Sequence, residues 1–270
     1  MDKVIVTGVL QLSGFHLCVR LLNEGINVVG IDTLNKNKKY KEEMLLSIGR
    51  NANFEYVESL DDVKDFCGVD LFFHLCGELM NDSELNKIIT LCDKYQIPII
   101  YISSLDVYGR GESCCYEDTM LRPVTPLGKR KKHEEMMLLS NSEEKKRKLV
   151  IFRTPYIYGP WQHQGHCMHK LIYMHVKKNI GLDKLLSNET FANQYMYVED
   201  LIEAIMLVIN RGFQCEIFNL SVNEQMFSSM KAREHLSFQP KITLQEGIEK
   251  QKQHIIKMLK VDPLFFEYKG

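Results

Sequence analysis

The sequence predicts an α/β protein built around a doubly wound parallel sheet. Short apolar runs alternate with segments of helical periodicity from the first residues onward. Several of these runs are apolar at nearly every position, which is typical of strands that helices cover on both faces. The repeated β-α-β order, without an internal repeat or a low-complexity tract, is what such a fold produces.

The predicted elements of the first half alternate regularly between strand and helix. The strands are expected at Val4–Thr7, Asn27–Asp32, Phe54–Val57, Val69–Leu75 and Ile97–Ser103. The helices between them are expected at Phe15–Asn23, Lys36–Ile48 and Glu84–Tyr95. In these helices apolar residues recur at the third and fourth positions, so one face of each would pack on the sheet.

The second half continues after a loop rich in glycine, serine and proline at residues 109–128. The expected elements are a charged helix at about Lys129–Ser140, a strand at Leu149–Arg153, a helix at Val198–Asn210, a strand at Glu216–Leu220 and a helix at Leu244–Leu259. No linker separates them, so a second region would interleave with the first. We expect a main domain of residues 1–176, to which residues 195–220 return, and a small C-terminal region of residues 177–194 and 221–270.

Composition and charge exclude several classes of protein. A chain of 270 residues, 45% hydrophobic and 26% charged, can bury one large core. A net charge of −1 gives no reason to expect nucleic acid or an acidic membrane as a partner. No apolar window is long enough to span a bilayer, and the N-terminus lacks the apolar stretch of a signal peptide. Eight cysteines at no metal-like spacing, mostly in apolar runs (Cys18, Cys76, Cys92, Cys215), indicate reduced, buried thiols and a cytoplasmic protein.

The loop after the first strand has the pattern of a phosphate-binding turn. Gly8 follows the strand and Gly14 opens a helix, whose N-terminal amides would bind a pyrophosphate. Gln11 occupies the middle position, where such loops usually have a third glycine. Asp32 ends the next strand, where a carboxylate binds the ribose hydroxyls and repels a 2′-phosphate. The loop therefore predicts a Rossmann site that prefers NAD(H), with NADP(H) possible; the alternative is an α/β domain without a dinucleotide.

Seven segments of the chain match one set of motifs in order. They are TGVLQLSG (7–14), VVGIDTL (28–34), DLFFHLCG (70–77), YISSLDVYG (101–109), FRTPYIYGP (152–160), YVEDLIEAI (197–205) and LQEGI (244–248). Together they resemble the extended short-chain dehydrogenase/reductases, the NAD-dependent epimerase/dehydratase group that acts on nucleotide sugars. The resemblance implies a nucleotide-sugar substrate, held partly by the small C-terminal region. It also implies a homodimer formed through the helices at Glu84–Tyr95 and Lys129–Ser140.

The resemblance also assigns cofactor-binding positions. The expected residues are Gly8, Gln11, Leu12, Gly14, Asp32, Leu60, Leu75, Cys76, Gly77, Lys131 and Pro155. The expected substrate-binding residues are Ser104, Tyr156 and Asn193, of which Tyr156 stands at a usual Asn and Asn193 at a frequent Arg.

The catalytic motif implied by the resemblance is incomplete. It comprises a tyrosine that transfers the proton, a lysine four residues later and a Ser/Thr that positions the oxygen. Ser104 and Lys131 match the last two and are the expected catalytic residues. The tyrosine position holds Leu127, and leucine cannot transfer a proton.

Three explanations for this gap stay open at the level of sequence. Another group supplies the proton, such as Ser104, Asp106, Tyr156 or a bound water. Alternatively, the motif is shifted by a loop, and Tyr116 or Tyr108 takes the role. In the third explanation the chain is a catalytically silent relative that binds NAD in a regulatory role.

The remaining departures favour a reductase. The related dTDP-glucose 4,6-dehydratases carry Asp-Glu directly after the Ser/Thr, and Leu105-Asp106 at that place disfavours elimination of water. Oxidising an alcohol needs a strong base, whereas reducing an activated ketone needs only a donor near the developing oxyanion. We therefore expect reduction of a 4-keto-6-deoxy sugar nucleotide, with a nucleotide-sugar 4-epimerase as the alternative.

One histidine-rich segment raises the question of a metal. Residues 161–169 read WQHQGHCMH and place His163, His166, Cys167 and His169 close together. No acidic ligand lies nearby, and the related proteins have a substrate loop here. We expect no metal.

Overall fold

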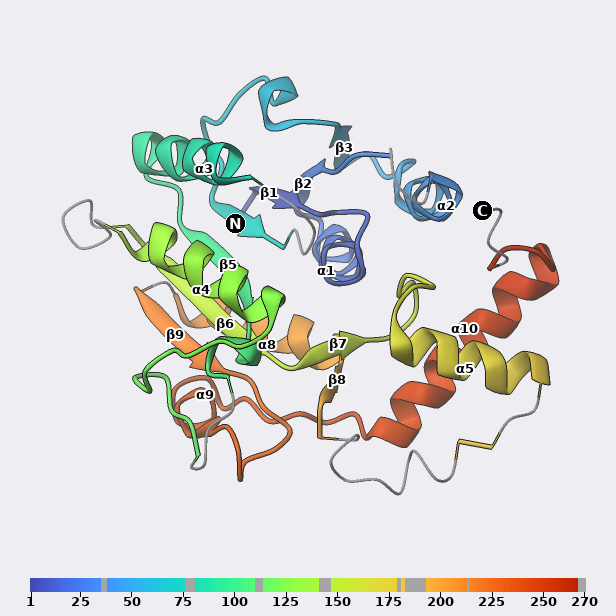
Figure 1. Ribbon diagram of the computed structural model, residues 1–270. Coiled ribbons are helices and arrows are strands. Elements are labelled where there is room, and N and C mark those ends of the chain that lie inside the picture. Colours follow the sequence, from blue (N-terminus) through green and yellow to red (C-terminus); the bar gives the residue numbers. More distant parts are fainter. Residues whose placement is uncertain are drawn as a thin grey trace.

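A sheet of seven strands runs through the middle of the molecule, and all of its strands pair in parallel (Figure 1). Its order is β3-β2-β1-β4-β5-β6-β9. The strands are β1 (Lys3–Thr7), β2 (Asn27–Ile31), β3 (Phe54–Val57), β4 (Leu71–His74), β5 (Ile99–Ser104), β6 (Leu149–Thr154) and β9 (Glu216–Asn219). The order reverses between β1 and β4, where an open α/β sheet leaves a crevice at the carboxyl ends of its strands.

The computed structural model describes residues 1–34, 38–75, 81–109, 114–140, 147–178, 181–182, 193–212 and 214–266. Its α-helices are α1 (Leu12–Asn23), α2 (Lys38–Ile48), α3 (Asp82–Tyr95), α4 (Pro126–Leu139), α5 (Cys167–Lys178), α8 (Val198–Arg211), α9 (Met230–Leu236) and α10 (Leu244–Val261). Two short 3₁₀ turns are η1 (Leu60–Asp62) and η2 (Leu105–Val107).

Helices cover both faces of the sheet. Successive residues of a strand point to opposite faces, so Val4 and Val6 of β1 pack in one core with α1 and α8. Ile5 between them packs in the other core with α3 and α4. Every residue of β4 and β6 is buried, which fits strands covered on both sides. The predicted fold class, a doubly wound parallel Rossmann sheet, is confirmed.

The apolar periodicity places two helix starts three residues too late. The first helix begins at Leu12, and α4 begins at Pro126. The Thr125 hydroxyl caps α4 by accepting a hydrogen bond from the Gly128 amide at 2.9 Å. Proline is well suited to the first helical position because it has no amide hydrogen to lose there.

Four helices and strands have no counterpart in the predicted set. They are β7 (Tyr156–Tyr158), β8 (Tyr195–Tyr197), α5 and α9. Strands β7 and β8 form a separate parallel pair, and α5 packs against α10 outside the main sheet (Figure 1). The proposed division into residues 1–176 with 195–220, and 177–194 with 221–270, stays a prediction.

Two expectations from composition can be compared with the structure. Among the described helices, none is both long and apolar enough to cross a membrane. Cys18 and Cys92 are buried as expected, whereas Cys215 is exposed, because it lies in the turn before β9 rather than inside the strand. Cys76 lies outside the described residues.

Candidate functional site

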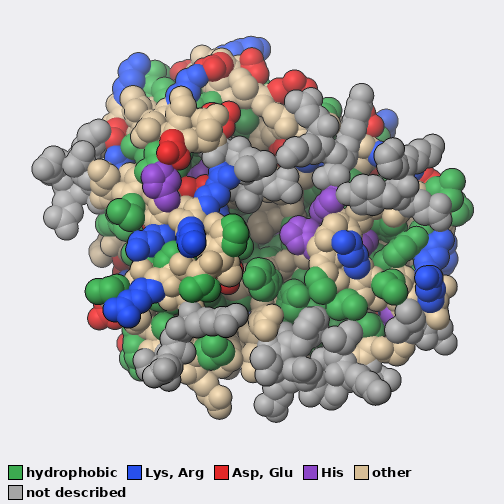
Figure 2. All heavy atoms as spheres, viewed as in Figure 1, with side chains coloured by type: hydrophobic (Ala, Val, Ile, Leu, Met, Phe, Trp, Pro, Cys, Tyr) green, Lys and Arg blue, Asp and Glu red, His purple; other side chains and the backbone are tan. Residues whose placement is uncertain are grey.

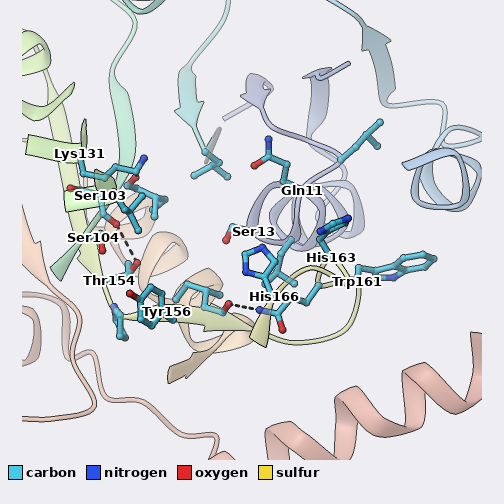
Figure 3. A pocket seen from close by; sticks show the side chains of 18 of the residues that line it. Gln11, Ser13, Ser103, Ser104, Lys131, Thr154, Tyr156, Trp161, His163 and His166 are labelled. Carbon is cyan, nitrogen blue, oxygen red and sulfur yellow. Dashed lines mark hydrogen bonds between the residues drawn. The ribbon is translucent and has the colours of Figure 1, made fainter. Parts of the chain in front are cut away.

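A cavity of about 270 Å³ opens at the carboxyl ends of the central strands. Figure 2 shows the hollow at the centre of this face, beside a group of histidine side chains. The lining comes from the loop after β1 and the start of α1, from α2, from the ends of β4, β5 and β6, from α4, and from β7 and the segment after it. Figure 3 shows Ser104 and Lys131 on one wall, with Gln11 and Ser13 across from them.

The loop after β1 presents the N-terminus of α1 to this cavity. Gly8 has a φ of 71°, which favours glycine. A Cβ on Gly14 would lie 2.1 Å from the Gly8 carbonyl oxygen, so only glycine lets the helix approach the loop. Gln11 is the N-cap residue, and no side chain caps the helix. Gln11, Leu12 and Ser13 line the cavity, which leaves the first-turn amides suited to a pyrophosphate. The residues present therefore fit a dinucleotide.

Asp32 follows β2 and lies next to this loop. Its Oδ2 accepts a hydrogen bond from the Leu10 amide at 2.9 Å, which ties the loop to the neighbouring strand. Leu75 and Pro155 line the cavity, as the cofactor assignment predicts. Leu60 is outside the cavity lining, because η1 packs it toward the core on the α3 side.

Ser104 ends β5 inside the cavity. It is 8% exposed, and its Oγ accepts a hydrogen bond from the Asp106 amide at 3.2 Å. A hydroxyl that accepts on one lone pair can still donate its own hydrogen. The first turn of α4 is fixed close by, because a Cβ on Gly128 would lie 2.3 Å from the Asp106 carbonyl oxygen. Leu127, one turn before Lys131 on α4, also lines the cavity.

Lys131 lies on the same wall of the cavity, and its ammonium is hydrogen-bonded to residues of β5. Its Nζ donates hydrogen bonds to the Tyr101 hydroxyl and the Ile102 carbonyl oxygen, both at 3.0 Å. Glu134 Oε2 lies 3.3 Å from the ammonium, and both side chains are buried. The arrangement places an ammonium and a hydroxyl on one side of the cavity, where both can stabilise negative charge that develops on a bound oxygen.

A buried polar network supports this lysine. The Tyr101 hydroxyl donates to Glu134, whose other oxygen accepts from Arg130 Nε at 2.7 Å. Burial alone raises the pKa of Glu134, but Lys131 together with the Tyr101 and Arg130 hydrogen bonds outweighs it, and the pKa is lowered. His74 stacks on Tyr101, and burial followed by the Lys131 charge lowers the pKa of His74 to about 3. The carboxylate is thus ionised and the imidazole neutral.

The two tyrosines that a shifted motif would use do not enter the cavity lining. Tyr108 is buried, where its hydroxyl accepts from Arg153 at 2.7 Å and donates to Asn219 at 2.7 Å. Tyr116 is 46% exposed in the loop before α4. Arg153 also forms a buried ion pair with Glu135 at 2.7 Å. The geometry therefore favours the register that places Leu127 beside Lys131.

Tyr156 lines the same cavity as Ser104. It is 45% exposed, and its hydroxyl lies 3.4 Å from Asp106 Oδ2, which also accepts from the Thr125 hydroxyl at 3.0 Å. Burial and then the Asp106 charge raise the pKa of Tyr156, so its hydroxyl stays protonated. Asn193 lies in the turn before β8 and outside the cavity lining. Cys76 and Gly77 lie outside the described residues.

The histidine segment divides between the cavity and the core. His163 and His166 line the cavity, whereas His169 is buried on α5 against Phe266, with ring centroids 4.8 Å apart. Within the described residues, no group of three or more His, Cys, Asp or Glu side chains could hold a metal ion.

Several lining residues have no counterpart among the sequence-predicted positions. They are Tyr40 and Lys41 of α2, Ser103, Thr154, Trp161 and Gln162. Thr154 and Ser103 follow directly from their adjacency to motif residues. Lys41 gives no signal in the sequence, because a lysine on a charged helix reads as a solvated position.

Comparisons with known proteins agree with this architecture. The NAD dependent epimerase/dehydratase family matches residues 4–221. A Bacillus subtilis protein described as an uncharacterized UDP-glucose epimerase is 24% identical over 77% of this chain and 73% of its own. Human dTDP-D-glucose 4,6-dehydratase is 24% identical over 86% of this chain and 72% of its own.

Solved structures share the fold over almost the whole chain. The NAD complex of UDP-glucuronic acid 4-epimerase from Bacillus cereus superimposes with a TM-score of 0.80 at 21% identity, covering 97% of this chain and 99% of the other. The NAD complex of dTDP-glucose 4,6-dehydratase from Bacillus anthracis gives 0.81 at 18% identity, covering 98% and 100%.

Proposed function

Because the chain belongs to the NAD dependent epimerase/dehydratase family, we propose that it is an oxidoreductase that reduces a 4-keto-6-deoxy sugar attached to UDP or dTDP. One observation supports the proposal most strongly. A single cavity joins the N-terminus of α1 to Ser104 and Lys131, while Leu127 occupies the turn before that lysine.

In this proposal each wall of the cavity has its own task. The nicotinamide dinucleotide supplies the hydride when bound. The first-turn amides of α1 bind its pyrophosphate, since the positive end of a helix favours an anion. Ser104 donates a hydrogen bond to the ketone oxygen, and the positive charge of Lys131 on the same wall stabilises the negative charge that develops there. That oxygen then takes up a proton, from the Ser104 hydroxyl or from solvent water, so the ketone gains one hydride from the cofactor and one proton.

The described side chains favour reduction over the other reactions of the family. An alcohol must lose its proton before oxidation, and Leu127 cannot accept one. Leu105 has no acidic group, and it is 4% exposed and packs with Val107 and Tyr108. Asp106 is therefore the one carboxylate at the two positions where elimination of water would use two acidic groups. It accepts hydrogen bonds from the Thr125 and Tyr156 hydroxyls.

The proposal extends to the partners of the chain. We propose NAD(H) or NADP(H) as the cofactor, a cytoplasmic location, and a homodimer formed through α3 and α4. Analytical ultracentrifugation at micromolar concentration tests the dimer, because a dimer has twice the mass of the 31.5 kDa chain.

A comparison of nucleotide-sugar reactions tests the function. Purified protein is incubated with NADH or NADPH and a dTDP- or UDP-linked 4-keto-6-deoxy sugar, and the loss of absorbance of the reduced cofactor is followed. The 4-epimerase alternative is tested in the same preparation with UDP-glucose and NAD, by chromatographic separation of the epimers. We expect reduction without epimerisation, and Ser104→Ala should lower the rate by about 100-fold, as loss of one oxyanion donor does. Epimerisation without reduction would replace the proposal with its alternative.

A further inference from the structure

The carboxylate expected to select NAD(H) is held by three groups of its own chain. Asp32 accepts hydrogen bonds from the Leu10 amide at 2.9 Å and the Thr33 amide at 2.7 Å. Its Oδ1 also forms an ion pair with Lys41 Nζ at 2.5 Å. Three of the roughly four acceptor sites of the carboxylate are therefore taken, and the side chain is only 5% exposed. Ribose hydroxyls would have to compete with these partners.

Lys41, rather than Asp32, faces the cavity. The lysine lies on α2, donates a second hydrogen bond to the Thr33 carbonyl oxygen at 2.7 Å, and has a side chain that is 11% exposed. The cavity lining includes Lys41 and Leu10 but not Asp32. Among the described residues at the end of the cavity next to the loop after β1, Lys41 is the charged residue of the lining.

The charge of this pair changes what the site can accept. An unpaired carboxylate repels a phosphate on the adenosine ribose, which is why an acid after the second strand normally selects NAD. Here the positive charge of Lys41 offsets the negative charge of Asp32, since Lys41 Nζ lies 2.5 Å from Asp32 Oδ1. An ammonium beside a phosphate forms a charge-assisted hydrogen bond, which is stronger than one between neutral groups.

We propose that Lys41 is the residue that determines cofactor specificity and that the chain binds NADP(H) at least as tightly as NAD(H), through an ion pair between Lys41 and the 2′-phosphate. This inference rests on the proposed use of a nicotinamide dinucleotide, and it removes the basis of the sequence-derived preference for NAD(H). Asp32 retains a structural task, because its hydrogen bond to the Leu10 amide holds the loop after β1.

Calorimetric titration with four compounds tests the proposal without any substrate. NADPH is compared with NADH, and adenosine 2′,5′-bisphosphate with 5′-AMP, since each pair differs by the 2′-phosphate. Lys41→Met should weaken NADPH and the bisphosphate by about tenfold or more, corresponding to one charge-assisted bond, while NADH and 5′-AMP change by less than about threefold. Lys39→Met is the matched control, because Lys39 carries the same charge on the same helix but pairs with Asp262.

A second variant guards against loss of folding in Lys41→Met. Asp32→Asn leaves Lys41 without its anionic partner and should tighten NADPH relative to NADH by about tenfold. The proposal is overturned if the unaltered protein binds NADH tenfold more tightly than NADPH, or if neither variant changes the ratio of the two affinities. Tight binding of NADPH without turnover of any keto sugar would support this inference and reject the proposed reaction, whereas absence of dinucleotide binding would reject both.

Discussion

Acidification should destabilise the fold through His169. This side chain lies on α5 at 2% exposure and packs on Phe266. Burial, followed by the charges of His254, His163 and His166, lowers its pKa from 6.5 to about 3. The folded state therefore keeps His169 neutral at a pH where the unfolded chain binds a proton.

The sign and the size of the effect follow from linkage. Because the folded-state pKa is depressed, stability is complete above pH 6.5 and falls as the pH drops toward 3. In the unfolded chain the pKa is 6.5, so pH 5 lies about 1.5 units below it and protonation stabilises the unfolded chain by about 2 kcal/mol. The conversion uses about 1.4 kcal/mol per pKa unit. The pKa of His254 is lowered to about 4 by burial, so it adds a loss in the same direction.

Urea denaturation at pH 8 and pH 5 measures this loss of unfolding free energy. His169→Leu removes the titrating group but keeps an apolar side chain against Phe266. We expect the unaltered protein to lose about 2 kcal/mol more than His169→Leu between the two pH values. The control is His133→Gln, because His133 is exposed at the surface of α4. Identical pH dependence of the unaltered protein and His169→Leu would refute the reasoning.

Three further substitutions test the positions that shape the site. Gly14→Ala places a Cβ 2.1 Å from the Gly8 carbonyl oxygen and should abolish dinucleotide binding and lower the melting temperature; thermal unfolding with and without NADH checks this, and unchanged binding would contradict the assigned loop. Glu135→Ala leaves Arg153 buried without its carboxylate and should cost about 3–5 kcal/mol in chemical denaturation, so a loss below about 1 kcal/mol would show the pair to be dispensable. Leu127→Tyr should keep or raise the rate of keto-sugar reduction; turnover that occurs only in this variant would identify the unaltered chain as a catalytically silent relative.

The strands of the central sheet could be predicted because short runs of mainly apolar residues indicate burial on both faces. Leu71–His74 and Leu149–Thr154 are buried at every position, and apolar residues at most of those positions are typical of strands covered on both faces. The short strands Tyr156–Tyr158 and Tyr195–Tyr197 lack this signal. Their tyrosines pack on one another and on α10 only in the folded chain, so tertiary contacts decide their conformation.

Some residues of the candidate site could likewise be predicted from the sequence, and others could not. Ser104, Leu75 and Pro155 could be predicted because motif residues at strand ends gather at one edge of a parallel sheet. The pairing of Lys41 with Asp32 could not, since it depends on how α2 is placed beside the loop after β1. For Leu60, similarity of local sequence predicts a cofactor contact; the side chain packs partly buried against the core on the α3 side and lies outside the cavity lining, so the contact stays a prediction.

The most direct test of the proposed function is a single-turnover experiment on the unaltered protein. Enzyme in excess is mixed with NADPH or NADH and a dTDP-linked 4-keto-6-deoxy sugar, and the product is identified by mass spectrometry with a cofactor that carries deuterium at the transferable position. The account predicts one deuterium incorporated into the sugar, at a rate that Ser104→Ala lowers by about 100-fold. Full recovery of the unlabelled keto sugar, from protein shown by calorimetry to have bound both the cofactor and the sugar nucleotide, would contradict it.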